Sequence, residues 1–258
     1  MGFIFNRDKK VSKDGTKVDV IRYSDADNRA WEPVTESEKY VEELTAYMEG
    51  IFPCEKAKPS VFHELVSDIV HIDVNIIPPD NGRDYYVLWT SGMSDRPMTL
   101  PDGDYDKKIY ERAELMLFLP EDWKIGEIGE TGEGMGDADY WPIRWLKYLA
   151  RFPHEYGTWL GTGHTLPNGE DYDPLGEGTE MGGFFFLPVI PIGEAYPGVD
   201  ALFCKDGTQI NFLWAIPMYE EEIEYKLQEG FDAMMDLFTR VSFPRVLDPK
   251  RPNYCREN

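Results

Sequence analysis

One short stretch near residue 70 limits what this chain can fold into. Residues 70–76 alternate strictly, with valine or isoleucine at every even position and a polar residue at every odd one. A period of two is typical of a β-strand that turns one face to a core. Pro78 and Pro79 end the strand, because proline cannot donate to a strand ladder. Asp80-Asn81-Gly82 supplies turn residues and Tyr85–Thr90 a second apolar run, so an antiparallel hairpin is predicted.

Further strands and helices are predicted from patterns of the same kind. Apolar or alternating runs predict strands at Lys17–Tyr23, Ala113–Leu119, Phe184–Ile190 and Gln209–Met218. Helical spacing predicts helices at residues 36–51, after a capping box at Thr35–Glu38, from Pro142 to Pro153, and at Glu220–Val241. Gly230 is expected to kink or split the last helix. Strands in the middle with helices on both sides predict an α+β fold with a mixed, largely antiparallel sheet.

The domain organisation is expected to be simple. A chain of 258 residues can bury a substantial core, and it contains no internal repeat. We expect an N-terminal lead at residues 1–35, one domain at residues 36–241 and an extended tail at residues 242–258, which carries three prolines. Two glycine-rich acidic stretches, Gly126–Asp139 and Asn168–Gly183, are predicted to be surface loops.

The charge of the chain is strongly acidic. Asp and Glu number 48 against 26 Lys and Arg, which gives a formal net charge of −22. Such a field repels nucleic acids and anionic membranes and speeds encounter with basic partners. A basic protein is therefore the expected partner, although the charge could also serve solubility alone.

Cysteine usage and hydropathy indicate a cytoplasmic protein. The three cysteines, Cys54, Cys204 and Cys255, are widely spaced and predict neither a disulfide framework nor a zinc site. No run approaches the roughly 20 apolar residues of a membrane-spanning helix, and the N-terminus lacks the form of a secretory signal.

The sequence offers two places for an enzyme, and each has a simpler explanation. His71 and Asp73 share one face of the first strand, as metal ligands would, but they also fit an ordinary polar face. Ser91 and Ser94 follow a strand, as a hydrolase nucleophile does, yet no helix follows them, and a turn that bonds its own backbone explains them equally well. Nucleotide-binding fingerprints are absent. We assign no catalytic residue, metal or cofactor, and keep a hydrolase or metal-dependent enzyme as the alternative.

Several segments, taken in chain order over residues 36–240, resemble the suppressor of fused family. They are His71–Ile76 with its double proline, the turn Thr90–Asp95, Ala113–Pro120 with Asp122 and Trp123, Trp141–Arg151, Thr158 with Trp159, Gly163 with His164, and Ile210–Pro217 followed by the helix Glu220–Leu237.

This resemblance implies a mixed α/β domain without known catalytic activity. Animal members hold a transcription factor by a short peptide that joins as an added strand. Those members carry a further C-terminal domain, whereas this chain is more similar to shorter bacterial members, which are suspected of acting as immunity proteins against toxins. The loop at Arg96–Pro101 lacks the aromatic residue of the animal peptide site, so a different ligand is expected.

The resulting prediction is a protein that binds another protein and has no chemistry of its own. A purely structural subunit is a third possibility. We expect the binding surface at Ser91–Asp102, together with the loops Gly126–Asp139 and Asn168–Glu180. The candidate binding residues are Ser91, Ser94, Asp95, Met98, Asp102, Trp159 and His164.

Overall fold

The alternating stretch near residue 70 forms an inner strand of a large sheet. The computed structural model describes residues 6–11, 13, 17–22, 34, 37–55, 59–64, 68–80, 82–125 and 136–256. Strand β4 (Asp73–Ile77) pairs antiparallel with β5 (Tyr85–Ser91), which confirms the predicted hairpin. The alternation therefore predicted the strand, and the turn residues with the run Tyr85–Thr90 predicted its partner.

The sheet has the order β3-β4-β5-β6-β10-β8-β7, and β9 pairs with the end of β10. Its strands are β3 (Ser60–Phe62), β4, β5, β6 (Ala113–Pro120), β7 (Thr165–Pro167), β8 (Gly183–Pro188), β9 (Leu202–Phe203) and β10 (Gln209–Met218). The β6–β10 pair is parallel, and the other pairs are antiparallel. The chain thus has the predicted α+β fold with a mixed, largely antiparallel sheet.

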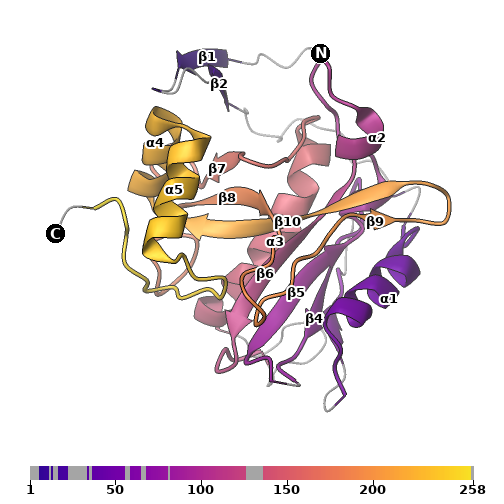
Figure 1. Cartoon of the computed structure of the whole chain (residues 1–258). Coiled ribbons are helices and arrows are strands. Elements are labelled where there is room, and N and C mark those ends of the chain that lie inside the picture. Colours follow the sequence, from indigo (N-terminus) through magenta and orange to yellow (C-terminus); the bar gives the residue numbers. More distant parts are fainter. Residues whose placement is uncertain are drawn as a thin grey trace.

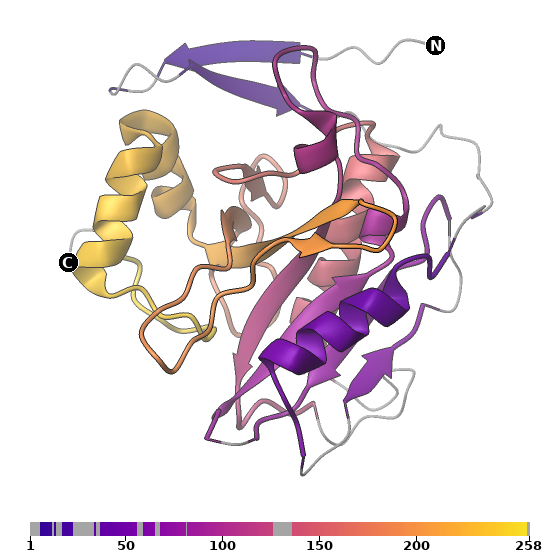
Figure 2. The same ribbon diagram turned by 45° about the vertical axis from the view of Figure 1, so that its right-hand side comes forward.

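Helices cover both faces of the sheet, as Figure 1 and Figure 2 show from two directions. Helix α3 (Asp137–Glu155) packs its apolar stripe on one face, and α1 (Val41–Ile51) covers part of the other. Helices α4 (Glu220–Glu229) and α5 (Phe231–Val241) cover the rest of the second face. The short helices η1 (Met93–Asp95) and α2 (Lys107–Tyr110) follow β5, while β1 (Asn6–Val11) and β2 (Lys17–Arg22) form a separate hairpin.

The predictions for the helices at residues 36–51 and Glu220–Val241 are confirmed in part and corrected in part. Gly230, with φ of 103°, splits the predicted helix Glu220–Val241 into α4 and α5. Helix α1 begins at Val41 instead of residue 36, because Glu38 adopts a positive φ of 60° that no helix tolerates. Thr35, in the predicted capping box, lies outside the described residues.

Helix α3 is longer than the prediction at both ends. It begins at Asp137 and ends at Glu155, so Pro142 and Pro153 lie inside it. Each proline removes one backbone donor, but the buried apolar stripe, which includes Ile143 and Leu146, keeps the helix continuous. The predicted loop at Gly126–Asp139 therefore ends earlier than expected, and residues 126–135 of it lie outside the described part.

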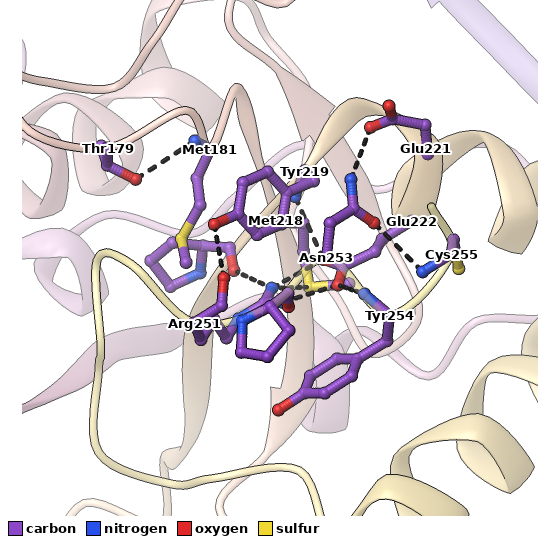
Figure 3. Close-up of polar contacts among 12 residues, drawn as sticks. Thr179, Met181, Met218, Tyr219, Glu221, Glu222, Arg251, Asn253, Tyr254 and Cys255 are labelled. Carbon is purple, nitrogen blue, oxygen red and sulfur yellow. Dashed lines mark hydrogen bonds and ion pairs between the residues drawn. The ribbon is translucent and has the colours of Figure 1, made fainter. Parts of the chain in front are cut away.

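The C-terminal tail is held on the body of the molecule by a buried ion pair (Figure 3). Arg251 donates from its two terminal nitrogens to the two carboxylate oxygens of Glu222, each at 2.6 Å, and both side chains are almost fully buried. Tyr219 donates to the backbone oxygen of Arg251 at 2.6 Å. The tail is thus fixed to the start of α4. Within the described residues, no helix is long and apolar enough to cross a membrane.

Candidate functional site

The conspicuous turn at Ser91–Asp95 lies in the interior. Ser91 is 6% exposed, Ser94 is fully buried and Asp95 is 4% exposed. Gly92 allows the turn, because a Cβ atom there would lie 1.8 Å from the backbone oxygen of His71 and its φ is 105°. The backbone of this turn therefore packs directly against the neighbouring strand segment.

The carboxyl group of Glu114 organises this turn from β6. It lies in a fully buried position and accepts hydrogen bonds at 2.9 Å from the Ser94 backbone and at 2.6 Å from the Ser94 hydroxyl. Its other oxygen is 2.6 Å from the Thr90 hydroxyl. Burial raises the pKa of Glu114 to about 8, so the group holds its proton at neutral pH. The sequence showed Glu114 as a single acid inside an apolar strand, a signal that the sequence analysis missed.

Asp95 and the two serines are also occupied by internal bonds. Asp95 accepts backbone hydrogen bonds from residues 38–40, at the start of α1, and burial raises its pKa. Ser91 accepts from the Asn75 side-chain amide at 2.9 Å. The histidine beside the turn, His154, bonds the backbone oxygen of Met93 at 3.0 Å, and burial lowers its pKa to about 4. Among the described hydrogen bonds neither serine contacts a histidine, so nothing in the geometry favours a hydrolase here.

His71 and Asp73 lie in contact, and His63, which directly follows β3, also contacts Asp73. Nδ1 of His63 is 2.9 Å from one oxygen of Asp73, and Nε2 of His71 is 3.2 Å from the other. Asp73 is only 6% exposed, so it does not sit on an open polar face. Across the described ranges, no group of three or more His, Cys, Asp or Glu side chains is arranged to hold a metal ion.

Of the remaining predicted residues, Trp159 lines a cavity at the start of β6, where Ala113 also belongs to the lining. Met98 is buried, and its sulfur lies 3.4 Å from the backbone nitrogen of Leu160. Trp159 is half-buried, and its ring meets that of His164 with centroids 4.5 Å apart. Gly161 permits this position, because a Cβ atom there would be 2.6 Å from the Trp159 ring. Asp102 lies on an exposed loop that precedes α2.

The cavity exists because two strands leave a gap along β10. Strand β8 pairs with β10 only as far as Pro188, opposite Leu213, and β9 resumes the pairing opposite Ile210. The described pairing leaves Asn211 and Phe212 without an antiparallel partner between these strands. The chain between β8 and β9 supplies part of the lining of the hollow left there, including Val189 and Asp200. We call the hollow the Trp159 cavity; its volume is about 240 Å³, and its lining includes Tyr110, Trp159, Val189, Asp200 and Phe212.

Apolar side chains are exposed around this cavity. Tyr110 and Ile190, which line it, are 44% and 55% exposed, and Phe203 on β9 is 71% exposed. Tyr105, also exposed, packs against Trp159 with ring centroids 4.9 Å apart. Figure 1 shows α2, which carries Tyr110, beside the end of β10 that pairs with β9. The sequence analysis missed Tyr105, Tyr110 and Phe203, since no local pattern separates an exposed ring from a buried one.

The described lining of the cavity carries no positively charged side chain. It contains the carboxylate of Asp200 and no lysine or arginine. Burial lowers the pKa of His164 to about 4, so this ring is uncharged at neutral pH. Asp102, Asp104 and Asp106 lie on the exposed loop around Tyr105.

The second predicted loop, Asn168–Glu180, is folded onto the domain. Asn168 donates to the backbone oxygen of Asp173 at 2.8 Å, and Leu175 and Thr179 are buried. Tyr172 donates to Glu224 on α4 at 2.7 Å. This loop therefore has a defined shape, with its acids on the outside.

Comparison with known proteins gives one consistent family. Residues 68–252 match the family model described as suppressor of fused protein. The fold is similar to the crystal structure of a suppressor of fused homologue from Neisseria gonorrhoeae, with a TM-score of 0.58 and 14% identity over 85% of this chain and 98% of that one. It is also similar to a chain in a Sufu–Fu complex, with a TM-score of 0.57 and 12% identity over 85% of this chain and 93% of that one. No curated protein sequence matches the chain.

Proposed function

This chain belongs to the suppressor of fused family, and we propose that it binds another protein through the Trp159 cavity and the exposed apolar side chains around it. The observation that carries the proposal is that the exposed side chains of Tyr110 and Ile190 line one hollow. Exposed Tyr105 packs on Trp159 of the same lining, and exposed Phe203 follows Ala201 of the lining by two residues. Exposed apolar side chains that gather at a cavity with polar groups on its rim are typical of a protein-binding site.

The family relationship supports a binding role over a catalytic one. A similar chain was crystallised as part of a Sufu–Fu complex, in which one protein binds another. In this chain, the hydroxyls of Ser91 and Ser94 are committed to internal hydrogen bonds. Of the candidate residues, we propose Asp102, Trp159 and His164 as parts of the binding surface or its immediate support, and Met98 as a residue that positions Leu160 behind it.

We further propose that the partner is basic and that the two proteins meet in the cytoplasm. The net charge of −22 and the acids around Tyr105 suit a basic partner, and the sparse cysteines suit a reducing compartment. Neutralisation of a toxin, as suspected for shorter bacterial members of the family, is the form of this function that we propose.

Affinity capture with matched variants tests the binding role. The tagged protein is used to capture partners from its native cells at low and moderate salt, and bound proteins are identified by mass spectrometry. Phe203→Ala and Tyr110→Ala remove exposed rings at the cavity, while Tyr148→Ala removes an exposed ring on α3, away from it.

The expected result is one basic protein, recovered in near-equal amount by the wild type and Tyr148→Ala and at least several-fold less by the cavity variants. Equal recovery by all four proteins would move the binding site elsewhere. Recovery of no specific protein at either salt concentration would contradict the binding role itself.

A further inference from the structure

The size of the Trp159 cavity limits what it can receive. Its volume of about 240 Å³ is below the roughly 300–1,000 Å³ of typical small-molecule sites. A cavity of this size has room for one long side chain of a partner. An inserted helix or strand would not fit.

The lining combines aromatic rings with aliphatic groups. The rings of Tyr110 and Trp159 stand at 72° to one another with centroids 6.4 Å apart. Leu160 and Val189 contribute aliphatic surface. Such walls suit a side chain with an apolar stem and a planar or cationic head, because ring faces attract cations.

Two polar groups of the lining could meet such a head. Asp200 is an exposed carboxylate and Thr162 adds a hydroxyl. The Asn211 amide, also in the lining, is already bonded to the backbone oxygen of Ile109 and to the Gln209 side chain. With no lysine or arginine in the described lining, and with His164 neutral, the local charge favours a cation. Outside the cavity, the three acids at residues 102–106 exceed the two lysines that follow at residues 107 and 108.

We propose that the Trp159 cavity receives an arginine side chain of the bound partner. The inference rests on the proposed function and names the anchor residue of that same site. Arginine combines an aliphatic stem, a planar cation that stacks on aromatic faces, and a fork of donors that matches the Asp200 carboxylate. Lysine lacks the plane and the fork, and a purely apolar anchor would make no use of the Asp200 carboxylate in the lining.

A titration with capped single amino acids tests this choice. The probe is N-acetyl-arginine N-methylamide, and the readout is the ¹H–¹⁵N indole signal of Trp159, which is assigned by its loss in Trp159→Leu. The matched probes are the citrulline analogue, which has the same shape without the charge, and the norleucine analogue, which keeps only the stem.

The expected result is weak, saturable binding of the arginine probe, about tenfold tighter than that of either other probe. Asp200→Asn, a change at an exposed position, should weaken the arginine probe about tenfold, while Tyr148→Ala should leave it unchanged. Equal binding of the norleucine probe would overturn the arginine anchor in favour of an apolar one. The absence of any shift of the Trp159 signal would overturn it as well.

The arginine anchor and the proposed binding role can fail independently of one another. If affinity capture yields a partner whose recovery depends on Phe203 and Tyr110 but not on Asp200, the binding role stands and the arginine anchor fails. If no partner is captured, the binding role fails whatever the probes do.

Discussion

Replacing Glu114 by glutamine should remove a pH dependence that this one buried carboxyl imposes on folding. The usual pKa of a glutamate is 4.5, and burial raises the pKa of Glu114 to about 8 in the folded protein. Because the folded state holds the proton more tightly, the free energy of unfolding falls as the pH rises between these two values. The slope is about 1.4 kcal/mol per pH unit, which amounts to about 5 kcal/mol over the whole interval. This is a large part of the roughly 5–15 kcal/mol that holds a domain folded.

Glutamine is the appropriate replacement because it imitates the protonated acid. Its carbonyl oxygen can accept from the backbone and hydroxyl of Ser94, and its amide can donate to the hydroxyl of Thr90, which occupy the two oxygens of Glu114 now. Little stability should therefore be lost at acidic pH, where the wild-type group is neutral. At alkaline pH, the variant should be the more stable of the two.

Chemical denaturation at pH 5.5, 7.0 and 8.5 measures the effect. The free energy of unfolding of Glu114→Gln, minus that of the wild type, should rise by about 3 kcal/mol from pH 5.5 to pH 8.5. Taking the difference removes the background from the other acids of the chain. Glu177→Gln, at an exposed carboxylate, serves as the control and should show a flat difference. A difference for Glu114→Gln that stays constant within about 0.5 kcal/mol would refute the claim that this carboxyl is neutral in the folded protein.

The other predictions concern the tail, the turn and the approach of the partner. Arg251→Met leaves a buried carboxylate without its cation, so urea denaturation should show a loss of about 3–5 kcal/mol, much of which Arg251→Met combined with Glu222→Leu should restore. A single variant as stable as the wild type would contradict this. Gly92→Ala should abolish soluble expression, because its Cβ atom would lie 1.8 Å from the oxygen of His71, whereas Gly136→Ala meets no atom within 4 Å and should fold. If the partner is steered by charge, its association rate should fall about tenfold between 20 mM and 200 mM salt in stopped-flow measurements, and a flat response would contradict steering.

The strands could be predicted from the sequence because their signals are local. The alternation at residues 70–76 and the run at Gln209–Met218 each mark a strand, and the turn residues after Pro79 mark the hairpin. The parallel pairing of β10 with β6 could not be predicted, because it joins residues about one hundred positions apart and leaves no local pattern. The start of α1 was misplaced for a related reason: the backbone amides of residues 38–40, just before the helix, donate to Asp95, far along the chain.

The candidate site shows the same division in chemical terms. The turn at Ser91–Asp95 carries the polar groups that sequence reasoning associates with chemistry or binding. In the fold, those groups bond to Glu114, to Asn75 and to the start of α1, so they stabilise the interior. The cavity, by contrast, arises from a change of strand partner along β10, which no sequence pattern records.

Buried polar groups that stabilise the fold can be told apart in this chain from exposed apolar groups that are available for binding. A buried polar group is costly unless it is bonded, so the bonds that join Ser94 and Thr90 to Glu114 account for the presence of these groups in the interior. The exposure of an apolar ring is not explained by folding in this way. Phe203 is 71% exposed, and burying its ring would have stabilised the fold. Such rings gather around the Trp159 cavity, while the bonded polar groups lie behind it. Substitutions at Ser94 or Glu114 should therefore act on binding only through stability, whereas substitutions at Phe203 or Asp200 should change binding and leave stability nearly unchanged.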